Sequence, residues 1–251
     1  MDSLYSGEFD CSWTVNGYLS SGKTLTLKEL HPQLSSWMKT TQNDVSAVKT
    51  YELKPDQWCI HESNLLTKMT ECLTTDKPSP WAVRMQVAAI GEFIKRDLDI
   101  QRESNNHLCF QERDVNCLLQ VFLPFLRSRG ILSPEDYAML WELAMSIRDI
   151  SAERMKPKKE IFLYADKDLC YDRFCQKNVA AEKSMSRHDF NEICLALDFW
   201  RNSADYQLDT SYMRPAEVAG RISDILKNEY SPLGTGLRLR DSEIREDYWD
   251  P

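Results

Sequence analysis

The sequence lacks any run of about 18 apolar residues, the length that a membrane-spanning helix requires. Its longest apolar stretch, residues 118–126, is interrupted by Gln120. The first residues also lack the basic start and the apolar block of a signal peptide. We therefore expect no membrane span and a cytoplasmic protein, with a nuclear location as the alternative and secretion excluded.

An excess of basic residues is also missing. Lysine and arginine number 31 against 39 acidic residues, so the net charge is −8. Binding along nucleic acid requires a concentrated basic surface, because neutralisation of phosphates drives that affinity. The composition therefore argues against extended nucleic-acid binding. Eight cysteines are scattered along the chain, and we expect them to be free thiols in a reducing compartment.

Helical periodicity is the dominant pattern from residue 55 onward. Ser79-Pro80 and Ser133-Pro134 each combine an N-cap residue with proline at the first helical position. Apolar residues then recur at spacings of three and four, which is typical of helices with one buried face. Such stripes run through residues 83–94 and 140–147.

Strand signals are weaker. Residues 9–16 alternate between apolar and polar, which predicts a half-buried strand. Residues 47–53 and 161–164 are further candidates. The fold class we predict is mainly α: a helical-hairpin bundle with a small β-containing N-terminal part and a flexible C-terminal tail. We divide the chain into a mixed strand and helix segment at 1–54 packed on a helical domain at 55–230, with a sub-lobe break considered at 155–160, and a charged, aromatic tail at 231–251.

The most specific motif is residues 17–24, Gly-Tyr-Leu-Ser-Ser-Gly-Lys-Thr, which resembles the phosphate-binding loop of P-loop NTPases. In such loops Gly17 and Gly22 would let backbone N–H groups approach phosphate oxygens. Lys23 would add positive charge, and Thr24 would hold magnesium. Asp166, which follows the apolar residues 161–164, would supply a carboxylate for the metal.

The context of this motif favours a simpler interpretation. A P-loop follows a strand buried in a parallel sheet, which should be apolar on both faces, whereas residues 10–16 alternate. Pro32 should also disturb the following helix within about two turns. We therefore expect a glycine turn that joins a strand to a helix. A structure with residues 161–164 parallel to residues 13–15, and residues 17–24 opening a helix beside them, would favour nucleotide binding instead.

Two other sets of residues were considered as sites. Cys59, His61, His107 and Cys109 carry ligand types that suit zinc, but their spacing departs from that of most structural zinc sites. In the acidic tail, Leu237, Leu239, Tyr248 and Trp249 could anchor a partner, since tryptophan is enriched at interface hot spots.

The functional hypothesis from the sequence is a non-catalytic intracellular protein, cellular or viral, that binds another protein as an adaptor, regulator or assembly subunit. It needs no cofactor. The alternative is a P-loop-type nucleotide-binding enzyme that uses residues 17–24, and a further alternative is a small structural-zinc protein.

Overall fold

The computed structural model describes residues 12–40, 47–53, 65–75, 77–104, 107–154, 158–177 and 185–230. Within them, five strands form a single sheet in the order β2-β3-β1-β4-β5, and every neighbouring pair is parallel. The strands are β1 Ser12–Gly17, β2 Ala47–Tyr51, β3 His107–Glu112, β4 Lys158–Tyr164 and β5 Tyr206–Asp209.

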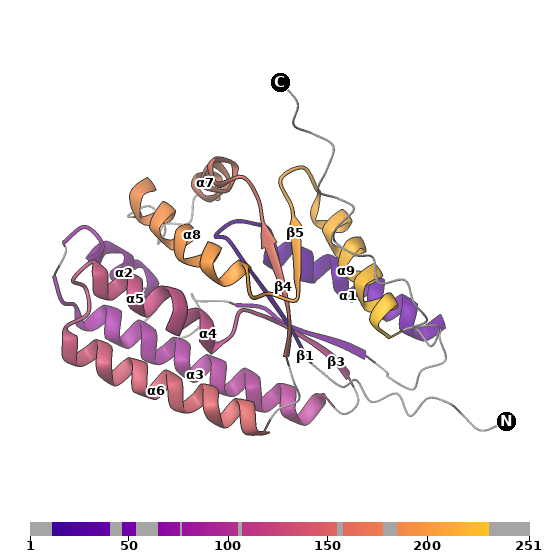
Figure 1. Cartoon of the computed structure of the whole chain (residues 1–251), viewed down its shortest axis with the longest axis horizontal. Coiled ribbons are helices and arrows are strands. Elements are labelled where there is room, and N and C mark those ends of the chain that lie inside the picture. Colours follow the sequence, from indigo (N-terminus) through magenta and orange to yellow (C-terminus); the bar gives the residue numbers. More distant parts are fainter. Residues whose placement is uncertain are drawn as a thin grey trace.

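Helices cover both faces of this sheet (Figure 1). One face is covered by α1 Lys23–Thr40 and α9 Pro215–Glu229, which pack on Trp13, Val15 and Ile161. The remaining helical segments lie toward the other face. They are α2 Leu65–Cys72, α3 Pro80–Glu103, α4 Val115–Cys117, the π-helical turn η2 Leu118–Phe122, α5 Leu123–Ser128, α6 Pro134–Arg154, α7 Lys167–Gln176 and α8 Arg187–Arg201.

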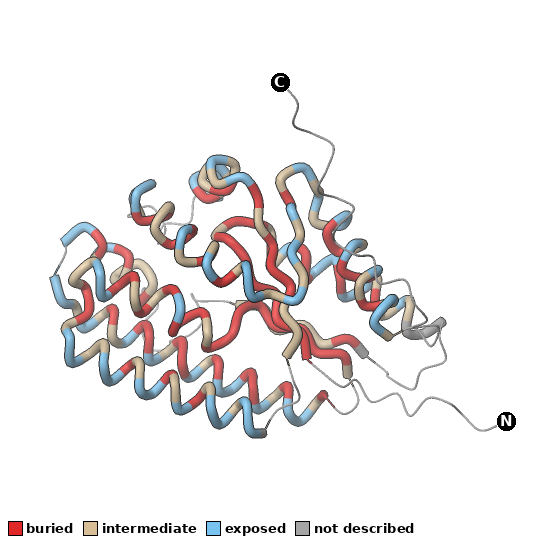
Figure 2. The backbone as a smooth tube through the Cα atoms, in the orientation of Figure 1, coloured by how far each residue is buried: buried red, intermediate tan, exposed pale blue. Residues whose placement is uncertain are grey.

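The predicted helical-hairpin bundle is therefore wrong, because the helices flank a parallel sheet instead of packing only on one another. The error began at β1, whose six residues are all buried (Figure 2). Ser12, Thr14 and Asn16 gave the strand a half-exposed pattern, yet they lie inside the protein at the centre of the sheet. The candidate strand at 47–53 is confirmed as β2 and that at 161–164 as part of β4.

The helix after β1 also differs from expectation, since α1 runs without a break through Pro32. Pro32 and Lys28, four residues before it, are both exposed. Water can therefore bind the Lys28 carbonyl that loses its helical donor. Pro124 is the second residue of α5, which begins directly after η2, and the wider π-helical turn accommodates the proline ring.

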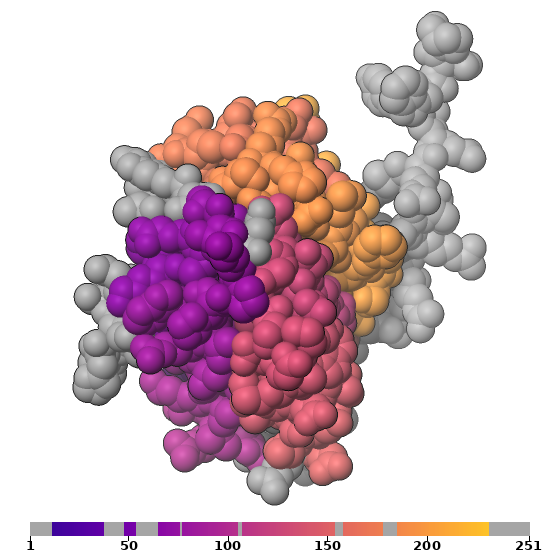
Figure 3. All heavy atoms as spheres, turned by 90° about the vertical axis from the view of Figure 1, so that its left-hand side faces the viewer, coloured from indigo at the N-terminus to yellow at the C-terminus, as the bar shows by residue number. Residues whose placement is uncertain are grey.

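Segments that are distant in sequence meet on the side of the molecule in Figure 3, where the purple region around α2, the pink α6 and the orange α8 lie together. Arg129, at the end of α5, connects the α2 region to α8: its Nη2 donates to the Leu73 carbonyl at 3.3 Å, and its Nε lies 3.2 Å from Asp189 Oδ1. In the part of the chain that the structure describes, no helix has the length and apolar character that crossing a bilayer requires.

Candidate active site

The strand order predicts that a ligand would bind at the carboxyl ends of β1 and β3. From β1 the chain leaves through α1 toward β2, while from β3 it crosses the opposite face of the sheet toward β4. Neighbouring parallel strands whose connections leave on opposite faces open a crevice between those connections, and α/β proteins bind ligands there. Residues 17–24 follow β1, and Glu112 and Arg113 end β3.

The loop between β1 and α1 has an unusual backbone. Three of its residues have positive φ: Gly17 at 145°, Ser20 at 59° and Gly22 at 94°. A Cβ atom on Gly17 would lie 2.0 Å from the Leu163 carbonyl oxygen of β4, so no other residue fits there without a backbone shift. The Tyr18 N–H donates to the same carbonyl at 3.2 Å. Glycine at 17 therefore lets the loop lie directly on β4.

Lys23 begins α1 and points back into the loop. Its Nζ donates to the Tyr18 carbonyl at 2.6 Å and reaches the Gly17 carbonyl at 3.4 Å. Burial, together with the nearby cations Arg113 and Lys177, lowers the pKa of Lys23 to about 7, although Glu112 acts in the opposite direction. Lys23 and Arg113 thus both direct a basic side chain at the Gly17 carbonyl, an arrangement that favours a bound anion beside the loop.

Thr24, the next residue, faces a carboxylate from the neighbouring strand. Its Oγ1 donates to Oε2 of Glu112 at 2.8 Å, and the Leu53 N–H donates to the same oxygen at 3.3 Å. Glu112 is buried, and it brings the end of β2 against the start of α1. A hydroxyl and a carboxylate at this spacing are oxygen donors of the kind that Mg²⁺ binds in nucleotide sites.

Arg113 follows Glu112 in a strained turn with φ of 58°. Its backbone N–H donates to the Val15 carbonyl, and its Nη2 donates to the Gly17 carbonyl, each at 3.1 Å. Nη1 donates to the Cys117 sulfur at 3.1 Å. Its side chain is buried, and no carboxylate within the described ranges forms a hydrogen bond or ion pair with it. Such a cation retains charge with which to attract an anion in the loop.

The loop also contacts α8. The Tyr18 hydroxyl donates to Asp198, and Asp198 forms an ion pair with Lys167 at 2.5 Å, at the start of α7. Burial and the hydrogen bond to Asp198 both raise the pKa of Tyr18. The start of α7 and the end of α8 are therefore tied to the first residue after Gly17.

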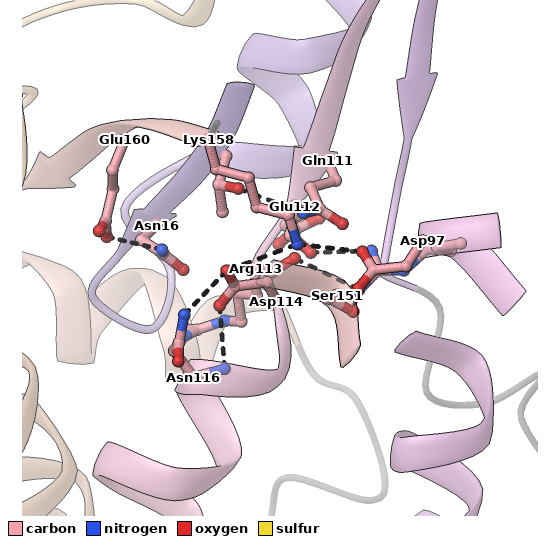
Figure 4. Close-up of polar contacts among 12 residues, drawn as sticks. Asn16, Asp97, Gln111, Glu112, Arg113, Asp114, Asn116, Ser151, Lys158 and Glu160 are labelled. Carbon is pink, nitrogen blue, oxygen red and sulfur yellow. Dashed lines mark hydrogen bonds and ion pairs between the residues drawn. The ribbon is translucent and has the colours of Figure 1, made fainter. Parts of the chain in front are cut away.

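Beneath the loop, polar side chains fill the space between β1, β3, β4 and the helices (Figure 4). Asn16 donates through Nδ2 to Glu160 at 2.6 Å, and Trp200 donates to the other Glu160 oxygen at 3.0 Å. Burial raises the pKa of Glu160 to about 7 against the lowering effect of the Asn16 bond, while Asp114 raises it further. This layer explains why β1 carries polar residues although it is central.

The structure brings Gly17, Gly22, Lys23 and Thr24 into one loop at the start of a helix, but it places Asp166 differently. Asp166 follows β4, and its Oδ1 accepts from the Asp168 and Leu169 N–H groups at 2.9 and 3.0 Å. It therefore caps α7. The carboxylate that contacts Thr24 is that of Glu112.

The remaining candidate residues do not assemble into a site in the described ranges. His107 and Cys109 lie on β3, where His107 Nδ1 is 3.0 Å from Glu103 Oε2 and Cys109 is buried. No group of three or more metal-ligating side chains occurs among the residues described. Cys59 and His61 lie outside these residues, as do Leu237, Leu239, Tyr248 and Trp249.

Sequence reasoning missed Glu112, Arg113 and the strand that carries them. A signal was present, since residues 108–110 are apolar and Gln-Glu-Arg-Asp follows directly. An apolar segment that ends in charged residues is the same pattern that drew attention to residues 161–166. The polar residues 103–106 directly before it weaken this strand signal.

A parallel sheet with helices on both faces, and a glycine-containing loop that opens a helix at the switch point, define a P-loop type of α/β protein. The family model for deoxynucleoside kinases matches residues 13–213, most of the chain, so the protein belongs to the deoxynucleoside kinase family. No curated protein matches the chain.

The family overturns the functional hypothesis from the sequence. The chain is a kinase enzyme of α/β fold, not an all-α adaptor or regulator, and the alternative of a P-loop-type enzyme is the better one. Two features argued against the motif: the alternating strand before it and the proline in the helix after it. Neither excludes it, because the polar residues of β1 are buried and α1 continues through Pro32. The predicted discriminating geometry is present: Val15 pairs with Ile161 in parallel, and α1 begins at Lys23 beside them.

Proposed function

We propose that this protein transfers the terminal phosphoryl group of a nucleoside triphosphate to a hydroxyl of a deoxynucleoside. The observation that carries the proposal is the Thr24 to Glu112 contact beside the loop of residues 17–24, at the switch point of a deoxynucleoside kinase sheet. In phosphoryl transfer the protein contributes chiefly positioning and charge stabilisation. Each role below follows from the position and surroundings of one side chain.

The loop of residues 17–24 would bind the triphosphate. Backbone N–H groups at the start of α1 point toward the loop and carry the partial positive charge of a helix N-terminus. Lys23 would exchange its bonds to the Tyr18 and Gly17 carbonyls for bonds to phosphate oxygens. Arg113, held by the Gly17 carbonyl, would stabilise the charge that develops on the transferred group.

Thr24 and Glu112 fit Mg²⁺, because their hydroxyl and carboxylate oxygens meet at 2.8 Å and are hard ligands. When bound, the ion neutralises charge on the phosphates. The Leu53 N–H group donates to the Glu112 carboxylate and orients it toward Thr24.

Glu52 is the proposed general base. It directly follows β2, one residue before the N–H group that binds Glu112, and Lys28 forms an ion pair with it at 3.8 Å. The Glu52 side chain is 16% exposed, so the hydroxyl of a substrate can reach it. A carboxylate at this position would accept the proton of the attacking hydroxyl.

The test is a phosphotransfer assay with Mg²⁺, ATP or GTP, and each of the four common deoxynucleosides. We expect a deoxynucleoside monophosphate product from the wild-type protein. Glu52→Gln and Glu112→Gln should each lower kcat by about 100-fold or more. Glu29→Gln, an exposed substitution of the same kind on α1, is the control and should leave kcat unchanged. Absence of product with every pair of substrates would contradict the proposal.

A further inference from the structure

Arg96 on α3 is a buried arginine whose side-chain hydrogen bonds all go to backbone carbonyls, and its guanidinium lies 4.7 Å from the centre of the Phe93 ring. It is 2% exposed, and its Nη1 donates to the Glu112 carbonyl at 2.9 Å and to the Tyr51 carbonyl at 3.4 Å. Its Nη2 donates to the Arg113 carbonyl at 3.3 Å. Among the described residues no carboxylate forms a hydrogen bond or ion pair with it, and its Nε has no partner.

Burying a guanidinium without a bonded carboxylate is unfavourable, because the lost hydration is not replaced by an ion pair. Desolvation accordingly lowers the pKa of Arg96, with Glu92 as the largest opposing charge. Three hydrogen bonds to carbonyls provide only partial compensation. A side chain whose burial is this unfavourable suggests a functional role in addition to packing.

The three carbonyls share a location, since they belong to the last residues of β2 and β3 or to the turn directly after β3. Tyr51 precedes Glu52, and Glu112 precedes Arg113. One planar guanidinium therefore spans the two strand ends that carry the proposed base and the acid that contacts Thr24. Strand pairing already joins β2 and β3 as far as Tyr51 and Gln111, and the fixed geometry of the guanidinium donors orients the residues that follow.

The turn after β3 needs such support because Arg113 has a positive φ, a conformation that persists only where the surroundings impose it. A second support lies beneath the same turn (Figure 4). Lys158 Nζ lies 4.0 Å from Asp114 Oδ2 and 3.0 Å from Asp97 Oδ1, and Ser151 donates to Asp97 at 2.6 Å. Arg96 and Asp97, adjacent on α3, thus act on one turn from two positions.

We propose that Arg96 is a positioning residue for phosphoryl transfer, which fixes Glu52 and Glu112 relative to each other and directs Arg113 toward the Gly17 carbonyl. This inference rests on the proposed function. Arg96 makes no hydrogen bond to residues 17–24, so its role lies in aligning the reacting groups and not in binding the triphosphate.

The decisive variant is Arg96→Lys, which keeps the charge but cannot span carbonyls of both strands with a planar fork. We expect kcat to fall by about 10- to 100-fold, as small misplacements of reacting groups do. The dissociation constant for ATP should change by less than about threefold, and the Mg²⁺ concentration for half-maximal activity should rise. Arg102→Lys, on the same helix with a side chain 75% exposed, is the matched control and should behave like wild type.

Rates are compared per folded protein, with the folded fraction taken from circular dichroism. A kcat of Arg96→Lys within twofold of wild type would overturn the inference, as would a loss of ATP affinity equal to the loss of kcat. If Arg96→Lys does not fold, Arg96→Gln, which keeps one amide donor and loses the fork, replaces it with the same two outcomes. A wild-type protein without phosphotransfer would overturn the proposed function itself and this role with it.

Discussion

The hydroxyl of Thr24 donates to the carboxylate of Glu112 at 2.8 Å, across the ends of two neighbouring strands. Thr24 lies in the first turn of α1 and Glu112 ends β3, so the two residues are 88 positions apart in the chain. Neither the threonine nor the glutamate alone identifies a nucleotide site. Their contact adds to the eight-residue motif the oxygen pair that we propose binds Mg²⁺.

Replacing Gly17 should destroy the loop. In Gly17→Ala the added Cβ would lie 2.0 Å from the Leu163 carbonyl oxygen, and φ of 145° is strained for alanine. We expect phosphotransfer to be lost, and thermal unfolding to occur at a lower temperature. Gly91→Ala on α3 is the control, because a Cβ there meets no atom within 4 Å. A fully active Gly17→Ala protein would show that the loop does not rest on β4 in this way.

We expect the protein to take up a proton when it binds a triphosphate above neutral pH. With a pKa of about 7, Lys23 is mostly uncharged at pH 8, and phosphate oxygens would favour its charged form. Isothermal titration calorimetry of ATP in buffers of different ionisation enthalpy should give an uptake near one proton at pH 8 and little at pH 6. Lys227→Met on α9 should not change this uptake. A proton count that is equal at both pH values would contradict the assignment.

The free energy of unfolding should depend on pH through Glu160. Because its pKa in the folded protein is raised to about 7 from 4.5, the native state binds this proton more tightly than the unfolded state. The contribution of the protonated Glu160 carboxyl group to the free energy of unfolding is therefore present below about pH 4.5 and is lost as the pH rises through 7. In Glu160→Gln, urea denaturation from pH 5 to pH 8 should show a shallower decline, whereas Glu29→Gln should follow wild type. If the unfolding free energy fell with pH equally in all three proteins, the role of Glu160 in the pH dependence would be refuted.

The π-helical turn should be sensitive to lost volume. Leu119 is 2% exposed within the main core cluster, so Leu119→Ala should lower the free energy of unfolding by about 2–5 kcal/mol. Leu195→Ala, at a position 53% exposed on α8, should cost less than about 0.5 kcal/mol. Equal effects of the two substitutions in urea denaturation would show that η2 is not part of the core.

The sequence located most helices but not the faces that they bury. Caps at Ser79 and Ser133 could be predicted because their hydrogen bonds are local. Within α3, however, Val87 and Ile94 were expected to be buried and are exposed, whereas Met85, Ala89 and Phe93 point inward. The buried set is shifted around the helix, because tertiary packing and not hydrophobicity alone decides which face meets the core.

The site could be predicted only in part for a related reason. Residues 17–24 form a contiguous motif, and their spacing alone suggested phosphate binding. Glu112 and Arg96 act through contacts with Thr24 and with backbone carbonyls that depend on strand order. Nothing in the spacing of residues 96 and 112 reveals that β3 lies beside β1. The polar residues Thr14 and Asn16 also concealed a central strand, because they face a buried polar layer that no periodicity test anticipates.

The support of Gly17 by Leu163 has a consequence for the nascent chain. The loop rests on a strand that is synthesised about 150 residues later, which takes about 7 to 30 s at ordinary rates of translation. Through that interval β1 has been made while β4, one of its two partners in the sheet, has not. A ribosome halted before residue 163 would carry the whole phosphate-binding motif without the surface that shapes it. Stalled-ribosome complexes should therefore gain nucleotide binding only after β4 has emerged.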